Sequence, residues 1–514
     1  MKPRTPSTDR NQEAPKAAKP AAPSARIPGT PSPAKRAELR AKRSATPKRP
    51  APKKPVAVAK HGKANPLKPG QPKPSQPNPI KPRQIKSKPS TPRPAPEQNT
   101  LGDRIGAKIT RRASDRLREG YLWVYASDIE AINTGEGAAS EGAPPALLPV
   151  ADSRGLLLGT ALYSPASQIA LRMVSREAID EAAWLKLLAE RLRTAIGRRK
   201  PLLNKDTDAC RLCFSEADQL PGVVADKYGD LVILQLLAKG LDSAAVRETC
   251  VRVLREELKP KTILERPDAR MRELEGLTAP APGPLWTADA VAPVTSSQFR
   301  LNGLTFQFDA NSGQKTGAFL DQKANYAAVR EWAKTLGTTG RALDVCCYQG
   351  GFALHLAQVC EQVTGIDSSR ASLEVAERNC VANHKKVTAQ VDWVEGDAFQ
   401  ILRDWSDSGE TFDTIVLDPP AFAKTQRAVE GALRGYKELN LRALKMLRPG
   451  GLLVTCSCSH HVGWAELEAS VASAAIDAHR RVRLLERRGA SIDHPVVLNL
   501  PETEYLKCLV LQVE

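Results

Sequence analysis

Two short segments hold the residue types that could do chemistry on a planar base. Residues 417–422 read LDPPAF and residues 455–459 read TCSCS, and each segment follows an apolar run. In a parallel α/β sheet, the loops just past the carboxyl ends of strands are where ligands and reacting groups meet. An acid followed by two prolines and an aromatic can grip a base, and a cysteine thiolate can attack one. The pair therefore predicts methyl transfer to a nucleobase, with cytosine as the base that needs a thiolate.

The cysteine has a specific part in such a reaction. Carbon 5 of cytosine is a poor nucleophile, and a thiolate added to carbon 6 makes an enamine that can attack an electrophilic methyl group. We predict Cys458 as the nucleophile and Asp418 as the partner that hydrogen-bonds the ring and favours protonation at N3. Cys456 is expected to pack in the core. Three further residues would shape a slot for a flipped base: Pro419, Pro420 and Phe422.

Glycines and acids follow successive predicted strands in the same part of the chain. Gly350 and Gly351 let the backbone approach a ligand closely, and the next helix offers a positive N-terminus. Acids end four predicted strands: Asp344, Asp367, Asp397 and Asp418. An acid after the second strand can bond ribose hydroxyls, and one after the third can accept from an adenine amino group. This ordered set fits S-adenosylmethionine. A dinucleotide dehydrogenase would show the full GxGxxG, although any single acid could instead be a helix N-cap.

Alternating strands and helices from residue 294 onward must position these groups. Apolar runs predict six strands, at 341–345, 362–366, 391–394, 412–417, 451–455 and 505–513. That alternation is typical of a mostly parallel, doubly wound α/β sheet. No metal is expected, because the spacing in residues 456–461 (CSCSHH) is too compressed for tetrahedral ligands.

Two smaller regions precede this sheet. Residues 105–176 read as short strands and turns, and Arg111 and Arg112 lie shortly before two aromatics, which suits contact with RNA or a solvated basic face. Residues 177–293 predict a middle α/β domain with a helix at 179–199, a hairpin turning at 228–230, a helix at 246–258 and a strand at 262–265. The lone CxxC of Cys210 and Cys213 is expected to be two packing thiols.

The basic charge of the chain lies in residues 1–100. This tail has 24 Lys/Arg against 4 Asp/Glu and holds 23 of the 40 prolines. We expect it to be disordered, and either to bind nucleic acid or to act as a solubilising extension. No apolar stretch reaches the ~18 residues that a membrane span needs, and no signal peptide is evident. The ten cysteines are scattered, which suits a reducing compartment, so we expect a cytoplasmic protein without a membrane partner.

Several segments resemble one known family, the large-subunit ribosomal RNA methyltransferase I group. They are 162–169 (LYSPASQI), 216–222 (EADQLPG), 313–322 (GQKTGAFLDQ), 348–352 (YQGGF), 418–422 (DPPAF), 434–438 (RGYKE) and 457–459 (SCS). The resemblance runs from about residue 106 to the end. It implies a PUA domain at 105–176, a middle α/β domain at 177–293, and a class I methyltransferase domain with a Rossmann-like, seven-stranded sheet at 294–514.

The resemblance also implies an activity and roles for residues. Family members look like enzymes that make 5-methylcytosine in 23S ribosomal RNA, with S-adenosylmethionine as the cofactor, and they suggest a homodimer. Cofactor contacts are implied or predicted at Lys315, Thr316, Phe319, Asp321, Tyr348, Gly350, Gly351, Asp367, Ser368, Asp397 and Asp418. Substrate contacts are expected at Pro419, Pro420, Phe422, Lys437, Arg111 and Arg112. The chain departs from the family pattern in its basic tail and at His460, where a glycine is common.

Two other functions remain open from the sequence. Methylation of a guanine or adenine nitrogen also uses turns of the DPP-aromatic type, but it needs no covalent cysteine. An RNA-binding assembly factor with an idle cofactor fold is the alternative from another class. The presence of Cys458 favours the cytosine reaction over both.

Overall fold

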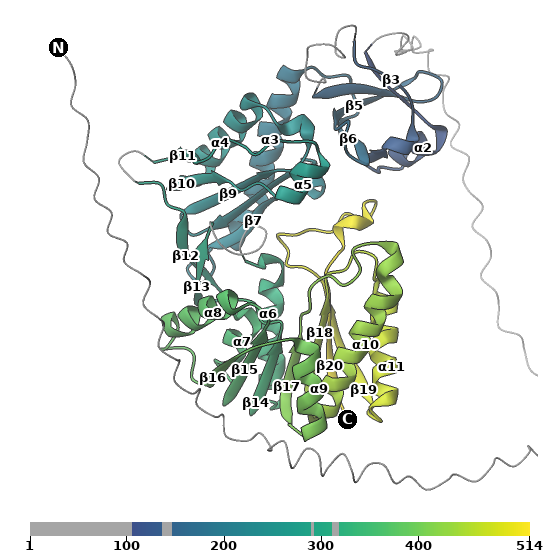
Figure 1. Cartoon of the computed structure of the whole chain (residues 1–514). Helices are drawn as coiled ribbons and strands as arrows, with labels where there is room; N and C mark the ends of the chain where they lie inside the picture. Colours follow the sequence, from purple (N-terminus) through teal and green to yellow (C-terminus); the bar gives the residue numbers. More distant parts are fainter. Residues whose placement is uncertain (1–104, 136–145, 289–291, 311–317) are drawn as a thin grey trace, which may run out of the picture. The chain divides into compact units, whose positions relative to one another are not determined.

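The computed structural model describes residues 105–135, 146–288, 292–310 and 318–514. The predicted basic tail and the predicted cofactor residues Lys315 and Thr316 lie outside these ranges. The described residues form a six-stranded, a five-stranded and a seven-stranded sheet and one two-stranded hairpin (Figure 1). Within these ranges, no helix is long and apolar enough to cross a membrane.

The first sheet has the strand order β2-β6-β5-β4-β1-β3. Its strands are β1 (Gly106–Ile109), β2 (Trp123–Tyr125), β3 (Ile129–Asn133), β4 (Leu147–Ala151), β5 (Leu157–Tyr163) and β6 (Ile169–Ser175). The expectation of strands and turns alone was wrong at α2 (Arg111–Arg118). Thr110 caps this helix by accepting from the amide of Ala113, and Ala113 and Leu117 are buried on one side. The helical spacing of these small and apolar residues outweighs the β-rich surroundings.

The middle sheet has the order β11-β10-β9-β8-β7 and carries helices α3 and α4. Its elements are α3 (Glu181–Arg199), β7 (Ala209–Phe214), β8 (Val223–Tyr228), β9 (Leu231–Leu236), α4 (Ala244–Leu258), β10 (Thr262–Glu265), α5 (Ala269–Leu274) and β11 (Pro284–Thr287). The predicted hairpin is confirmed, because β8 and β9 pair antiparallel around Gly229, whose φ is 57°. Cys210 and Cys213 are fully buried in the core between this sheet and its helices.

The third sheet contains the predicted site and has the order β16-β15-β14-β17-β18-β20-β19. Its strands are β14 (Arg341–Val345), β15 (Gln362–Asp367), β16 (Gln390–Glu395), β17 (Phe412–Leu417), β18 (Leu447–Ser457), β19 (Val482–Arg488) and β20 (Lys507–Val513). Only β20 runs antiparallel to its two neighbours, so the mostly parallel, doubly wound sheet is confirmed. The residue pattern did not predict β19, because this edge strand is rich in arginine and little buried.

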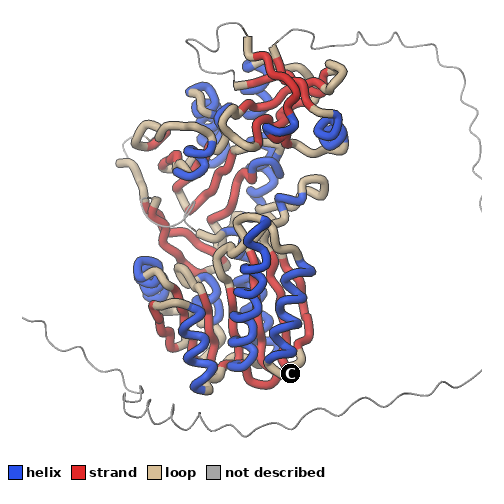
Figure 2. Tube along the Cα trace, turned by 45° about the vertical axis from the view of Figure 1, so that its right-hand side comes forward, coloured by secondary structure: helices blue, strands red, loops and turns tan. Residues whose placement is uncertain are grey.

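Helices cover both faces of the seven-stranded sheet. They are α6 (Lys323–Leu336), α7 (Gly351–Leu356), α8 (Arg370–Ala382), α9 (Ala398–Ser408), α10 (Val429–Met446) and α11 (Trp464–Asp477). Alternate strand residues serve two cores: Val416 packs with α6 and α7, whereas Ile415 packs with α9, α10 and α11. Figures 1 and 2 show α9, α10 and α11 lying along the strands on one face.

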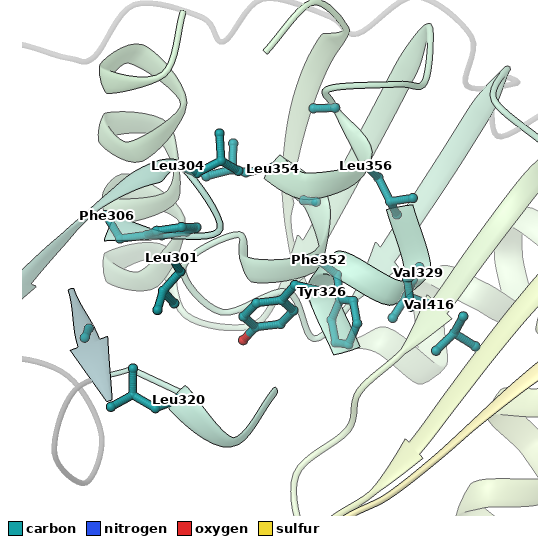
Figure 3. Packing of buried hydrophobic residues seen from close by; sticks show 14 of the residues in the cluster. Leu301, Leu304, Phe306, Leu320, Tyr326, Val329, Phe352, Leu354, Leu356 and Val416 are labelled. Carbon is teal, nitrogen blue, oxygen red and sulfur yellow. The ribbon is translucent and has the colours of Figure 1, made fainter. Parts of the chain in front are cut away.

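A hairpin of β12 (Ser296–Leu301) and β13 (Leu304–Asp309) precedes this sheet. Leu301, Leu304 and Phe306 of the hairpin are buried in the same cluster as Tyr326 and Phe352 of α6 and α7 (Figure 3). The hairpin therefore adds apolar side chains beside the loop that follows β14.

Candidate active site

The loop between β14 and α7 has an unusual backbone. Cys346 and Tyr348 have φ values of 62° and 51°, and Gly350 has a φ of 84°. A Cβ at Gly350 would lie 3.0 Å from the indole of Trp393, so glycine is favoured there by both space and conformation. Non-glycine residues with positive φ cost free energy and cluster at ligand sites. The loop between β14 and α7 thus concentrates three residues with positive φ within five positions.

A solvent-open cavity of about 470 Å³ lies beside this loop, at the carboxyl ends of β14 and β17. Four predicted site residues line it: Phe319, Tyr348, Gly351 and Asp418. The rings of Phe319 and Tyr348 meet edge to face, with 5.0 Å between their centroids. The remaining lining residues are Phe299, Leu301, Phe306, Ala318, Tyr326, Asp344, Cys346, Cys347, Gln349 and Phe352. The cavity therefore combines aromatic walls with two carboxyl groups.

Asp344 is the more deeply buried of these two carboxyl groups, with 0% of the residue exposed. Its Oδ2 accepts from the amide of Ala353 at 2.8 Å, which ties the end of β14 to α7. Its Oδ1 has no hydrogen-bond partner among the described residues. Burial, and to a smaller extent Asp418 and Asp367, raise the pKa of Asp344 to about 8 although the Ala353 amide opposes this. A cationic ligand in the cavity would supply the missing partner.

Asp367 organises the loop from the neighbouring strand. Its Oδ2 accepts from the amide of Tyr348 at 2.9 Å, and its Oδ1 accepts from the amide of Ser369 at 2.9 Å. Ser368 is exposed at the same strand end. Asp397 is exposed and caps α9 by accepting from the amide of Gln400 at 2.9 Å. For Asp397, the structure thus shows the N-cap role that was the alternative to cofactor binding.

Asp418 lines the cavity and begins the DPPAF turn that follows β17. Gln322 donates its side-chain amide to both oxygens of Asp418 at 3.1 Å. Burial and then the nearby Asp321 raise the pKa of Asp418 to about 7, although the bond from Gln322 opposes the rise. Asp321 is itself buried and accepts from the hydroxyl of Tyr505 at 2.5 Å. Near neutral pH, Asp418 can therefore exist with or without its proton.

Cys458 lies against the turn that follows β17. Its Sγ is 3.9 Å from the main-chain oxygen of Pro419. The cysteine loop is fixed to this turn by Ser459, whose Oγ is 3.2 Å from the amide nitrogen of Ala423 and 3.1 Å from the Tyr436 hydroxyl oxygen. The structure thus brings the two motifs together. Cys456, in contrast, is completely buried and pairs across the strands with Cys508.

The remaining predicted substrate residues lie in different surroundings. Pro420 is exposed, and Phe422 packs against Tyr436 with 4.9 Å between ring centroids. Lys437 forms an ion pair of 2.8 Å with Asp477 of α11 rather than with the turn after β17. Arg111 and Arg112 are exposed at the start of α2. The structure therefore joins Phe422 to the site and places Lys437 in a helix–helix contact.

Gln322 is a polar site residue with no role predicted from the sequence, where it is only the last residue of the GQKTGAFLDQ segment. Asp344 was predicted only as one member of the set of strand-end acids that fits the cofactor. The aromatic lining from the β12–β13 hairpin was also missed, because its alternating pattern indicates a strand but does not say which sheet it approaches. Among the described residues, no group of three or more His, Cys, Asp or Glu side chains is placed to hold a metal ion.

Comparisons with known proteins define the class. Family models match as a PUA-like domain at residues 107–176 and as an S-adenosylmethionine-dependent methyltransferase at residues 279–497. SMU.776, assigned as a methyltransferase and crystallised with SAH, has a similar fold, with a TM-score of 0.65 and 19% identity over 79% of this chain and 100% of its own. A second structure, assigned as a methyltransferase of Streptococcus mutans, has a TM-score of 0.64 at 18% identity, over 79% of this chain and 100% of its own. The chain is a class I, S-adenosylmethionine-dependent methyltransferase with a PUA-like domain.

Curated relatives narrow this class to one family. Ribosomal RNA large subunit methyltransferase I of Pseudoalteromonas translucida is 35% identical over 402 residues, which are 77% of this chain and 96% of the relative. The protein of the same name from Shewanella denitrificans is 35% identical over 413 residues, which are 80% and 99%. The chain belongs to the ribosomal RNA large subunit methyltransferase I family.

The cavity fits the cofactor of this class. S-Adenosylmethionine carries an ammonium and a sulfonium, which suit the unpartnered Oδ1 of Asp344. Its flat adenine suits the aromatic walls formed by Phe319 and Tyr348. The bound cofactor would supply an electrophilic methyl group.

Proposed function

We propose that this protein methylates carbon 5 of a cytosine in large-subunit ribosomal RNA, through a covalent bond between Cys458 and the base. The observation that carries the proposal is the position of Cys458, whose Sγ lies 3.9 Å from the Pro419 oxygen of the Asp418 turn. A base held by that turn has a sulfur on one side and a titratable carboxyl group beside it. The relatives are named for the large ribosomal subunit, which supports 23S RNA as the substrate and the cytoplasm as the location.

The residues divide the chemistry as follows. The Cys458 thiolate adds to carbon 6 of the cytosine, and the electron pair of the 5,6 double bond becomes available at carbon 5. Asp418 in its protonated form donates its proton to N3 and so neutralises the negative charge that develops in the ring. After the methyl group is attached, with S-adenosylhomocysteine as the leaving group, carbon 5 loses its proton to water. N3 returns its proton to Asp418, the double bond re-forms and Cys458 leaves as the thiolate. The pKa of Asp418 of about 7 leaves a large protonated fraction at neutral pH.

Pro419, Pro420 and Phe422 are the proposed walls of the slot for a flipped base. Phe422 is held by ring contacts to Phe399 and Tyr436, at 5.9 Å and 4.9 Å between centroids. This packing supports a rigid wall, and aromatic faces are the usual platforms for unstacked bases. Arg111 and Arg112 are proposed to contact RNA from the PUA-like domain. A contact of Lys437 with RNA is also proposed and would replace its partly exposed ion pair with Asp477.

The test measures both the product and the adduct. The full chain would be incubated with methyl-labelled cofactor and ribosomal RNA that lacks the modification, and the labelled nucleoside identified by mass. We expect 5-methylcytosine from the wild type and from Cys456→Ala, and none from Cys458→Ala. RNA carrying 5-fluorocytosine, which cannot lose a proton from carbon 5, should trap a denaturation-resistant complex with Cys456→Ala but not with Cys458→Ala.

Cys456→Ala is the matched control, because it removes a thiol two residues away, near the end of β18. A methylated guanine or adenine as the product would replace the proposed reaction with nitrogen methylation. Activity that survives Cys458→Ala would contradict the covalent mechanism. Binding of the RNA without any methyl transfer would favour the assembly-factor alternative.

A further inference from the structure

Lys507 begins strand β20 and lies inside the protein beside the cysteine loop. Only 2% of the residue is exposed. It is the direct cross-strand partner of Ser457, the residue before Cys458. Its Nζ donates to the main-chain oxygen of Ser459 at 2.9 Å and to that of Tyr505 at 3.0 Å. The ammonium therefore reaches along the strand end past Cys458.

This ammonium is not neutralised by a carboxylate in contact with it. Among the described residues, no Asp or Glu forms an ion pair with Lys507 within 4.0 Å. Burial lowers the pKa of Lys507, whereas the negative charges of Glu504, Cys458 and Glu466 oppose that effect. A buried ammonium held only by neutral carbonyl groups is costly and is stabilised by an anion nearby.

Of the three groups whose negative charge raises the pKa of Lys507, the Cys458 thiol is the one on the loop that this ammonium holds through Ser459. We infer that Lys507 is a positioning residue that stabilises the Cys458 thiolate electrostatically and holds the cysteine loop through the Ser459 oxygen. This inference rests on the proposed function, in which Cys458 is the nucleophile. The thiol proton passes to solvent, the negative charge stays on sulfur, and no bond to Lys507 forms. A thiolate beside a lysine ammonium is the arrangement that lowers cysteine pKa values at reactive sites.

Other titratable groups surround the thiol and must be considered together with Lys507. The loop after β17 contributes Asp418, α10 contributes Tyr436, and the segment before β20 contributes Tyr505 and Glu504. Burial raises the pKa of both tyrosines, so their hydroxyls stay neutral near pH 7. The cysteine loop adds two imidazoles, and α11 adds a carboxylate: His460, His461 and Glu466. Lys507 is the ammonium in this set, and Asp418 opposes thiolate formation once it loses its proton.

The direct test titrates the thiol without RNA or cofactor. The folded full chain would be treated with iodoacetamide between pH 5.5 and pH 10, and the rate of alkylation at Cys458 followed by mass spectrometry, with fragment ions separating Cys458 from Cys456. We expect an apparent pKa at least about one unit below the ordinary value of roughly 8.5. In Lys507→Met, the pKa should return to that value or above, which slows alkylation at pH 7 about ten-fold while the rates at pH 10 converge.

Two further variants separate charge from shape. Lys507→Arg keeps the positive charge and should retain the low pKa of Cys458, whereas Lys445→Met removes a lysine that is exposed on α10 and should change nothing. Equal loss of alkylation at every pH in Lys507→Met would indicate a displaced loop and overturn the inference. An ordinary thiol pKa in the wild type would also overturn it, whether or not the variants fold. Because this titration involves no methyl transfer, its failure is distinct from a failure to form 5-methylcytosine, which would overturn the proposed function itself.

Discussion

The side-chain amide of Gln322 donates to both carboxylate oxygens of Asp418, with 3.1 Å between Nε2 and each oxygen. Gln322 belongs to the short helical turn at Leu320–Gln322, directly before α6, whereas Asp418 follows β17. The bond favours the ionised form of Asp418, while burial and Asp321 favour the protonated form. Gln322 therefore lowers the pKa of Asp418, the proposed acid, and shifts it toward the ionised form.

The first prediction concerns the pH dependence of methyl transfer. If protonated Asp418 donates to N3, activity falls as pH rises through the pKa of Asp418, which is about 7 before substrate binds. Gln322→Leu removes a bond to the ionised form, so the pKa of Asp418 rises and the alkaline limb of kcat/KM should move to higher pH, by on the order of one unit. The measurement is a pH profile of single-turnover and steady-state rates.

Asp418→Asn gives the control for this profile. Asparagine has no titrating carboxyl group, so the alkaline limb assigned to Asp418 should disappear together with most of the activity. An alkaline limb that stays in place in both variants would show that another group controls it. A shift to lower pH in Gln322→Leu would contradict the role of the amide.

The second prediction concerns Asp344. Its pKa is raised to about 8 in the folded chain from 3.8, so its contribution to folding is complete at low pH and is lost as pH rises through 8. Asp344→Asn keeps an acceptor for Ala353 but removes the charge. At pH 9 without cofactor, the variant should melt at least about 3 °C above the wild type, and this gap should narrow as the pH is lowered to 5.

The same substitution should weaken cofactor binding. Losing a charge-assisted contact to the ammonium or sulfonium of S-adenosylmethionine should raise Kd about ten-fold, measured by calorimetry at pH 8. We therefore expect Asp344→Asn to be more stable than the wild type but to bind the cofactor more weakly. The buried carboxylate destabilises the protein without ligand and stabilises the bound cofactor. Tighter binding, or lower stability at pH 9, would contradict this assignment.

Sequence patterns predicted the large sheet because parallel strands buried on both faces are nearly continuous apolar runs. The prediction for β14 (Arg341–Val345) has the bounds that the structure shows. Edge strand β19 was not predicted, because its exposed arginines remove the apolar pattern of a buried strand. Helix α2 was not predicted, because the Thr110 cap and a short buried stripe are weak signals within a β-rich region. Local periodicity thus predicts elements whose burial is extensive and misses those with a short buried face.

The candidate site shows a similar division. Cys458 and Asp418 were predicted as neighbours because both follow parallel strands that end at one edge of the sheet. The partners of those residues come from distant parts of the chain: Gln322 from before α6 and Lys507 from β20. Sequence spacing alone does not predict contacts between residues that are dozens of positions apart. Asp397 shows a different ambiguity, since it caps α9 and a strand-end acid and a helix N-cap look alike in sequence.

The third prediction concerns RNA binding through α2. Arg111 and Arg112 are exposed, and Arg111 has only a 3.9 Å contact to an exposed Asp115. Replacing both arginines with alanine should weaken RNA binding about five- to ten-fold at low salt and lessen the slope of log K against log salt by roughly one to two. The rate of methyl transfer at saturating RNA should not change. An unchanged slope of log K against log salt would show that Arg111 and Arg112 face solvent and do not contact the RNA.

The last prediction concerns the buried ion pair between Lys323 at the start of α6 and Asp493. Their Nζ and Oδ2 atoms lie 2.5 Å apart, and Asp493 also accepts from the main-chain amide of Arg211 in β7 at 2.9 Å. Burial alone would raise the pKa of Asp493, but His494 and Lys323 outweigh it and hold the pKa well below its usual range. Asp493 therefore stabilises the fold above its unfolded pKa of 3.8, and this contribution is lost as pH falls through the lower folded value.

Lys323→Met should accordingly cost about 3–5 kcal/mol at pH 7, because it leaves a buried carboxylate without its cation. The loss should be smaller in Lys323→Met combined with Asp493→Asn, which removes the charge while keeping an acceptor for the Arg211 amide. Urea unfolding at pH 7 and pH 4 measures both effects. The deficit of Lys323→Met should shrink at pH 4, since the unpaired Asp493 then takes up a proton. A deficit that is equal at both pH values, or a double variant less stable than the single one, would mean that Lys323 stabilises this contact by packing rather than by charge.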